Sequence, residues 1–230
     1  MAILLNLQEL LLSLADNVHI TSTEIGLYRN STNRTGWLNL AQKAFVRDTE
    51  CLSGNKDTSL VAVTSQQEYD LWTITNYLSV GKKGSVLFDG TRIPFKTMEQ
   101  MYSEFGESWW NADAGKPQCW YMRGKRYLGL HPKPSITYVG DVITVFYNKR
   151  PADMTLTTDT PFDGNTYLEE YTEAPLLWAS WKLLTKGKQT EEALMYAGLY
   201  EKMKNACKKD LRTDEPDRNY LRPFTYNRSR

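Results

Sequence analysis

Apolar residues near the start of the chain recur at steps of three and four, which places them on one face of an amphipathic helix. They are Leu4, Leu7, Leu11, Leu14 and Val18. A segment rich in Ser, Thr and Asn follows, and then a second helical stripe made of Trp37, Leu40, Ala41, Ala44 and Phe45. We expect this second helix to end near Gly54, because glycine readily takes the left-handed conformation of a helix C-cap.

The pattern changes to that of β-strands after Ser59. A short apolar run spans Leu60 to Val63, and two half-strands flank the pair Asp89 and Gly90. An Asp-Gly pair between apolar runs is a strong hairpin signal, because both residues tolerate positive φ. Segments 119–122, 126–130 and 142–147 are rich in strand-forming residues and predict three more strands.

Two segments have the pattern of a capping box, which begins a helix. Thr97–Gln100 predicts a short helix that ends before Gly106, and Thr166–Glu169 begins the most regular part of the chain. There, two apolar stripes joined by a short turn predict an antiparallel hairpin of helices that ends at Arg212. The first stripe contains Tyr171, Ala174, Trp178 and Trp181, and the second contains Ala193, Ala197, Tyr200, Met203 and Cys207. Pro175 predicts a kink or a late start in the first of these helices.

These patterns predict an α+β fold. We expect a helical bundle core with a C-terminal αα-hairpin, a small antiparallel β-sheet subdomain and an extended C-terminal tail. The expected parts are an N-terminal helical part (1–58), a β-rich part with a short helix (59–151), a connection followed by the helical hairpin (152–212), and a C-terminal arm (213–230).

The arm combines aromatic and arginine side chains without a helical or strand period. It has too many large apolar residues for a purely solvated segment, so we expect it to become ordered on a partner. The candidate partner-binding residues are Arg218, Tyr220, Leu221, Arg222, Phe224, Tyr226, Arg228 and Arg230.

Composition narrows the classes of function. The 230 residues carry 28 Lys and Arg against 27 Asp and Glu, a net charge of +1, so no chain-wide field attracts nucleic acid or an anionic membrane. The three cysteines, Cys51, Cys119 and Cys207, lack the spacing of a zinc site or a disulfide framework, which predicts reduced thiols. No stretch approaches the roughly 20 apolar residues of a membrane span, so we expect a protein made in the cytoplasm.

The sequence offers little material for catalysis. The two histidines, His19 and His131, have no Ser, Cys or Asp at a recognisable spacing, and no nucleotide-binding or metal-binding motif occurs. We therefore predict no catalytic residues, no cofactor and no metal site. The seven tryptophans would suit the stacking of sugars or single strands as well as buried interfaces, and composition does not choose among these.

Several weak motifs occur in a fixed order along most of the chain. They are the hairpin Phe88–Ile93, the loop Gly115-Lys116-Pro117 before an aromatic strand, the strand Tyr127–Pro132, the Val-rich strand that leads to Tyr147 and Pro151, and the helix opening Leu168-Glu169-Glu170-Tyr171. This order resembles the head-to-tail adaptor, or connector, proteins of tailed bacteriophages.

The resemblance implies a structural virion protein without catalytic activity. Its copies would form a ring of about twelve beneath the portal, help to close the DNA exit channel and contact tail or nozzle proteins. It implies a position in the neck between capsid portal and tail, with packaged DNA passing through the ring without sequence-specific binding.

Two alternatives remain at this point. Trp109, Trp110 and Trp120 would suit a carbohydrate-binding virion module if their rings are exposed. Another neck component, such as a stopper or tail-completion protein, would share the small size and ring symmetry.

Overall fold

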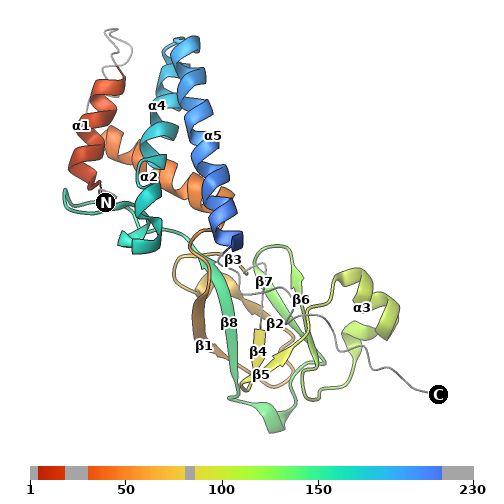
Figure 1. Cartoon of the computed structure of the whole chain (residues 1–230). Helices are drawn as coiled ribbons and strands as arrows, with labels where there is room; N and C mark the ends of the chain where they lie inside the picture. Colours follow the sequence, from red (N-terminus) through yellow and green to blue (C-terminus); the bar gives the residue numbers. More distant parts are fainter. Residues whose placement is uncertain (1–4, 19–30, 81–85, 214–230) are drawn as a thin grey trace. The chain divides into compact units, whose positions relative to one another are not determined.

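The chain divides into two compact units (Figure 1). A computed structural model describes residues 5–18, 31–80 and 86–213. The helical unit comprises Met1–Cys51 and Asp153–Arg230, and the β unit comprises Leu52–Ala152. The helical unit is therefore built from two separate stretches of the chain, and the β unit is inserted between them.

The helical unit contains α1 (Leu7–Asn17), α2 (Ser31–Thr49), α4 (Ala174–Lys186) and α5 (Thr190–Thr213). The β unit contains β1 (Asn55–Val61), β2 (Glu68–Asp70), β3 (Tyr77–Val80), β4 (Val86–Phe88), β5 (Thr91–Ile93), α3 (Met98–Phe105), β6 (Cys119–Arg123), β7 (Tyr127–His131) and β8 (Val142–Lys149). Short 3₁₀ helices include Trp109–Asn111, Pro161–Gly164 and Thr166–Tyr171.

Strand β8 organises the larger of two antiparallel sheets. It pairs with β1, β3 and β4, and β5 continues the sheet from β4. Its sequence of β-branched and aromatic residues suits a strand that is paired along its length. Alternate residues Ile143, Val145 and Tyr147 are buried in the core, as the two-residue period of a strand requires.

The smaller sheet has the order β2-β7-β6 and shares its core with the larger one. Tyr69, Leu128 and Leu130 from the smaller sheet lie in one buried cluster with Val86 and Phe88 from the larger. The β unit therefore has a hydrophobic core of its own.

Helix α4 is central to the helical unit, since it packs against α1, α2 and α5. Leu176, Ala179 and Leu183 of α4 are buried together with Leu10 and Leu14 of α1 at helical spacing. Leu11 and Trp178, which the predicted stripes placed in the core, are only partly buried.

Side-chain amides of α2 hold the chain where it returns from the β unit. Asn39 Nδ2 donates to the carbonyl oxygen of Met154 at 3.1 Å, and the N–H of Met154 donates to Asn39 Oδ1 at 2.8 Å. Gln42 Oε1 accepts the N–H of Phe162 at 3.2 Å, and Gln42 Nε2 donates to Asn39 Oδ1 at 3.0 Å. The returning segment is also bonded to α1, whose Leu7 N–H donates to the carbonyl of Asp159 at 2.7 Å.

The predicted helical bundle core with a small β-sheet subdomain was wrong, although the mixed α+β class agrees with the structure. In the described residues, eight strands form two antiparallel sheets around a separate core, beside five α-helices. The short strands β2 and β3 carry too little alternation to be recognised, and the pairing of β1 with β8 joins distant parts of the chain. The four-part division made from the sequence stays a prediction, and the expected tail from residue 214 onward lies outside the described residues.

We predict that Asn39→Ala lowers the free energy of unfolding by about 2 kcal/mol, because it leaves both backbone groups of buried Met154 without their partner. Asn39→Asp keeps the acceptor and loses the donor, so its loss should be intermediate. Urea denaturation followed by circular dichroism measures both; an alanine variant as stable as the parent would contradict the role of Asn39.

We predict that Gly129→Ala destabilises the β unit by about 3 kcal/mol or more, because a Cβ there would lie 2.0 Å from Cζ of the fully buried Tyr121 ring. Gly115→Ala is the matched control, since its Cβ would lie 3.4 Å from Pro132 Cγ, an ordinary contact. Thermal unfolding of the two variants should differ clearly, and equal melting temperatures would rule out the close packing of Tyr121 on Gly129.

Candidate interaction surfaces

The helical hairpin predicted from the sequence consists of α4 and α5, which pack along each other. Pro175 lies in the first turn of α4, where its missing N–H costs no hydrogen bond, so the helix begins late, at Ala174. The expected capping box at Thr166 is absent. Asn165 instead caps the 3₁₀ helix Thr166–Tyr171 by accepting the N–H of Tyr167.

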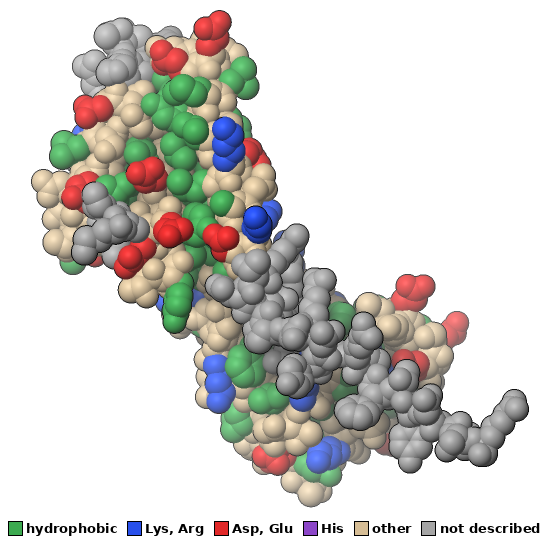
Figure 2. All heavy atoms as spheres, viewed as in Figure 1, with side chains coloured by type: hydrophobic (Ala, Val, Ile, Leu, Met, Phe, Trp, Pro, Cys, Tyr) green, Lys and Arg blue, Asp and Glu red, His purple; other side chains and the backbone are tan. Residues whose placement is uncertain are grey.

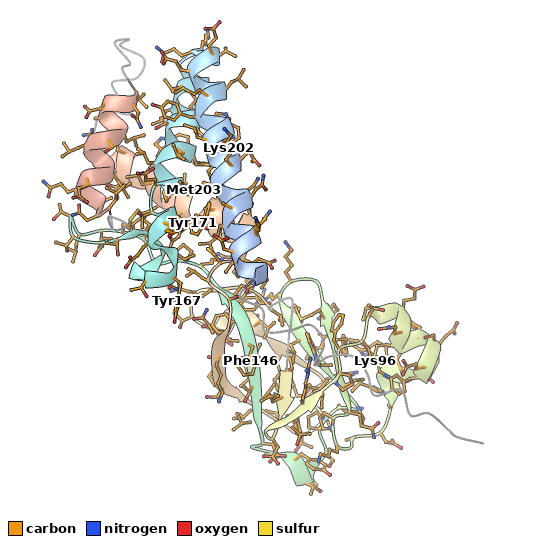
Figure 3. All side chains as sticks on the ribbon, viewed as in Figure 1. Lys96, Phe146, Tyr167, Tyr171, Lys202 and Met203 are labelled. Carbon is orange, nitrogen blue, oxygen red and sulfur yellow. The ribbon has the colours of Figure 1, made fainter. Side chains whose placement is uncertain are left out.

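An aromatic cluster connects α2 with α5 and with the two 3₁₀ helices that precede α4. The ring of Phe45 lies 5.3 Å from Phe162, 6.2 Å from Tyr171 and 6.1 Å from Tyr200, measured between centroids. The Tyr171 hydroxyl donates to the Asp210 carboxylate on α5. Burial and this carboxylate both raise the pKa of Tyr171, so the hydroxyl keeps its proton and its hydrogen bond. Figure 3 shows Tyr171 together with Met203 and Lys202 of α5.

Helix α5 also carries apolar side chains that its own unit leaves exposed. Ala193, Tyr200 and Cys207 are buried at a spacing of seven residues, whereas Leu194, Met195 and Leu199 are 66%, 55% and 41% exposed. We call the exposed side the α5 face; it comprises Glu191, Leu194, Met195, Gly198, Leu199, Lys202, Asn205 and Ala206. Such a row of apolar residues is typical of a contact surface.

The β unit has a different kind of surface around the turn that joins β6 to β7. Arg126 is paired with Asp70 at 3.0 Å and lies 4.6 Å from the ring centroid of Trp72, which is 61% exposed. Arg123 is paired with Glu68 and lies over the ring of Tyr127. The hydrogen bond from Arg126 lowers the pKa of Asp70, so this ion pair persists into acidic solution. Exposed aromatic and arginine side chains of this kind are enriched in protein interfaces.

The residues predicted to form the partner-binding arm are not among those that the structure describes. Arg218, Tyr220, Leu221, Arg222, Phe224, Tyr226, Arg228 and Arg230 all lie outside the described residues, as does His19. Their role therefore stays a prediction.

The structure brings together one pair that the sequence did not suggest. Cys119 and His131 are direct partners across β6 and β7. Burial raises the pKa of the Cys119 thiol and lowers the pKa of the His131 imidazole. Both shifts favour the neutral pair, whereas a nucleophilic cysteine requires the thiolate. The pair therefore has the electrostatics of a core contact.

The tryptophans proposed for sugar stacking do not form an exposed platform. Trp109 and Trp120 are 2% and 3% exposed, and Trp110 is the one of the three with a substantial exposed area. Trp109 packs edge-on against Trp110 and Tyr121, with centroids 4.9 Å and 5.0 Å apart. These rings fill the space between the 3₁₀ helix at Trp109 and the smaller sheet.

Within the described ranges, no group of three or more His, Cys, Asp or Glu side chains could hold a metal ion. In the same part of the chain, no helix is both long and apolar enough to cross a membrane. All three cysteines are buried free thiols.

Comparison with known families supplies the context for these surfaces. The family described as SU10 adaptor protein matches residues 5–225, which include all the helices and strands described above. No curated protein shows a significant match.

We predict that protonation of His131 destabilises the β unit. The imidazole is 5% exposed, its Nδ1 has no hydrogen-bond partner in the described residues, and the Phe105 ring centroid lies 4.3 Å away. Because the folded pKa is lowered by burial and by Lys96, stability is complete above the unfolded pKa of about 6.5 and falls as the pH drops towards the folded pKa.

The expected loss between about pH 7.5 and about pH 5.5 is up to about 1 kcal/mol. Urea denaturation at the two pH values measures it, and His131→Phe should remove most of the difference. The Asp70 and Asp159 carboxyls have lowered pKa values, so they remain ionised over this range. A variant with the same pH dependence as the parent would show that another group is responsible.

Proposed function

The chain belongs to the SU10 adaptor protein family of phage head-to-tail adaptors, and on that premise we propose that its copies form a ring joining the portal vertex to the tail. As a member of this family, the protein is a structural component of the virion that interacts with other virion components. We propose a position in the neck, a ring of about twelve copies and a part in closing the DNA exit channel.

The match over residues 5–225 carries this proposal, because it spans both units and extends into the arm. The exposed α5 face and the aromatic-arginine surface near Trp72 support it, since an adaptor needs separate contacts for its own copies, the portal and the tail. The net charge of +1 suits a ring through which DNA passes without sequence-specific binding.

We assign portal binding to the arm, residues 213–230. Its arginines can form charge-assisted hydrogen bonds with carboxylates of a partner, and its aromatic residues can fill apolar pockets there. The function proposed here needs no catalysis.

We predict that truncation after Arg212 weakens binding to the cognate portal ring by about tenfold or more, because it removes the arginine and aromatic anchors together. Binding is measured by pull-down and by sedimentation with purified portal. A second variant, with Arg218, Arg222, Arg228 and Arg230 changed to Ala, separates the charged contacts from the aromatic ones.

An unchanged melting temperature serves as the control that the truncated chain is folded. Undiminished binding by the truncated chain would refute the role of the arm and leave the adaptor role intact. A full-length chain that does not bind the portal would refute the adaptor role itself.

A further inference from the structure

Two of the three cysteines meet in the helical unit, and the function proposed above gives them no role. Cys51 is the last residue of the first stretch of this unit, directly before the β unit, and Cys207 lies near the end of α5. They are 7% and 0% exposed, and both are free thiols. The two thiols are hydrogen-bonded to each other. The fold therefore brings together two sulfur atoms that the whole β unit separates in the sequence.

Packing on either side of Cys207 fixes its position. The ring of Phe45 on α2 lies 6.1 Å from that of Tyr200, which precedes Cys207 by two helical turns and is buried on the same side of α5. Beyond Cys207, the carboxylate of Asp210 accepts the hydroxyl of Tyr171. Cys207 is thus held between two contacts that anchor α5, on the side that packs against α2.

We propose that Cys51 and Cys207 are a redox modification site, at which a peroxide converts the two thiols into an intramolecular disulfide. The bond joins the first stretch of the helical unit to the second and encloses the β unit. A disulfide that closes a long loop removes much of the freedom of the unfolded chain, so this bond stabilises the fold. The proposal goes beyond the adaptor function and does not depend on the ring.

A virion component passes through both reducing and oxidising surroundings. It is assembled inside a cell, where thiols are kept reduced, and is then released into an oxidising medium. The pair can therefore remain reduced while the chain folds and assembles, and become oxidised later.

The reaction has two steps and needs hydrogen peroxide, or another hydroperoxide, as the oxidant. In the first step the Cys51 sulfur attacks the O–O bond and becomes a sulfenic acid, and a water leaves with the thiol proton. In the second step the Cys207 sulfur attacks the Cys51 sulfur, the S–O bond breaks, and a second water leaves with the proton of Cys207. Two thiols lose two electrons in total, and one hydrogen peroxide is reduced to two waters.

The surroundings of the two thiols set the order of these steps. Cys51 reacts first because it is the more exposed of the two. Contact with Cys51, together with burial, raises the pKa of Cys207, so this thiol stays protonated at neutral pH and reacts slowly with free peroxide. The second step does not need a free oxidant, because Cys207 is already held against the sulfur that it attacks.

Oxidation of the purified full-length protein with hydrogen peroxide tests the site. The remaining thiols are alkylated in urea, and the proteolytic peptides are identified by mass spectrometry without reduction. The expected product is a pair of peptides joined through Cys51 and Cys207, which separates when a reductant is added. Apolar side chains are exposed along the helical unit (Figure 2), and one of them, Met195, is 55% exposed, so its sulfoxide shows that peroxide has acted.

Cys119 is the internal control. It is 1% exposed, and its sulfur contacts Met101 Sδ at 3.8 Å and the carbonyl oxygen of His131 at 3.7 Å. It should therefore remain a thiol that is alkylated in urea.

Thermal unfolding gives a second measurement. The oxidised protein should melt about 5 °C or more above the reduced protein, and dithiothreitol should abolish the difference. Cys51→Ser should lose both the joined peptides and the shift, whereas the matched variant Cys119→Ser should keep both. Each variant is compared with its own reduced form, so that the cost of the substitution cancels.

Three results would overturn the proposal. The first is a Met195 sulfoxide in protein whose Cys51 and Cys207 are still free thiols. The second is a disulfide that joins Cys51 to a second copy of the chain or to Cys119. The third is an equal rise in melting temperature when Cys51→Ser is oxidised. None of these results depends on whether the chain binds the portal, so each would leave the adaptor function intact.

Discussion

The helical unit depends on the hydrogen bonds by which Asn39 and Gln42 hold the returning chain. The unit is made of two stretches separated by the whole β unit, so its core closes only if residues 153–162 are fixed against α2. An amide side chain suits this task because it both donates to and accepts from a backbone. Backbone hydrogen bonds also join the same segment to the first turn of α1. The returning segment is therefore bonded to both α1 and α2.

With the return of the chain fixed, α4 can occupy the centre of the unit. It is buried against α1, α2 and α5. The ring of Phe45 on α2 also contacts Tyr200 of α5 and Phe162. This arrangement uses one side of α1 and one side of α5 for the core and leaves the other sides exposed. The exposed side of α5 therefore follows from the central position of α4.

Sequence patterns predicted local structure well where the signal lies within a few residues. The Asp89-Gly90 turn has positive φ at both residues, and the Thr97–Gln100 capping box is present. The ordered set of weak motifs also led to the adaptor family, which the match over residues 5–225 confirms. The first helix has a capping box as well, formed by Asn6 and Glu9, which an apolar stripe alone did not reveal.

Structure that depends on distant residues was not predictable in this way. The larger sheet forms because β8 pairs with three strands that precede it by long stretches of chain, and no single strand carries that information. The core that it shares with the smaller sheet likewise joins residues far apart in the sequence. The meeting of Cys119 with His131 follows from the register of the local hairpin β6–β7, whereas the burial of Trp109 depends on how the segment before β6 folds against this hairpin. The α5 face was not predicted either, because the apolar stripe recognised in this helix contained only residues expected to enter the core.

The central claim is that this chain forms the ring between portal and tail. A cryo-electron microscopy reconstruction of the virion neck tests it most directly. The account predicts density for this chain in a closed ring in direct contact with the portal. Density for the chain at a separate position below such a ring, or none in the neck, would contradict it.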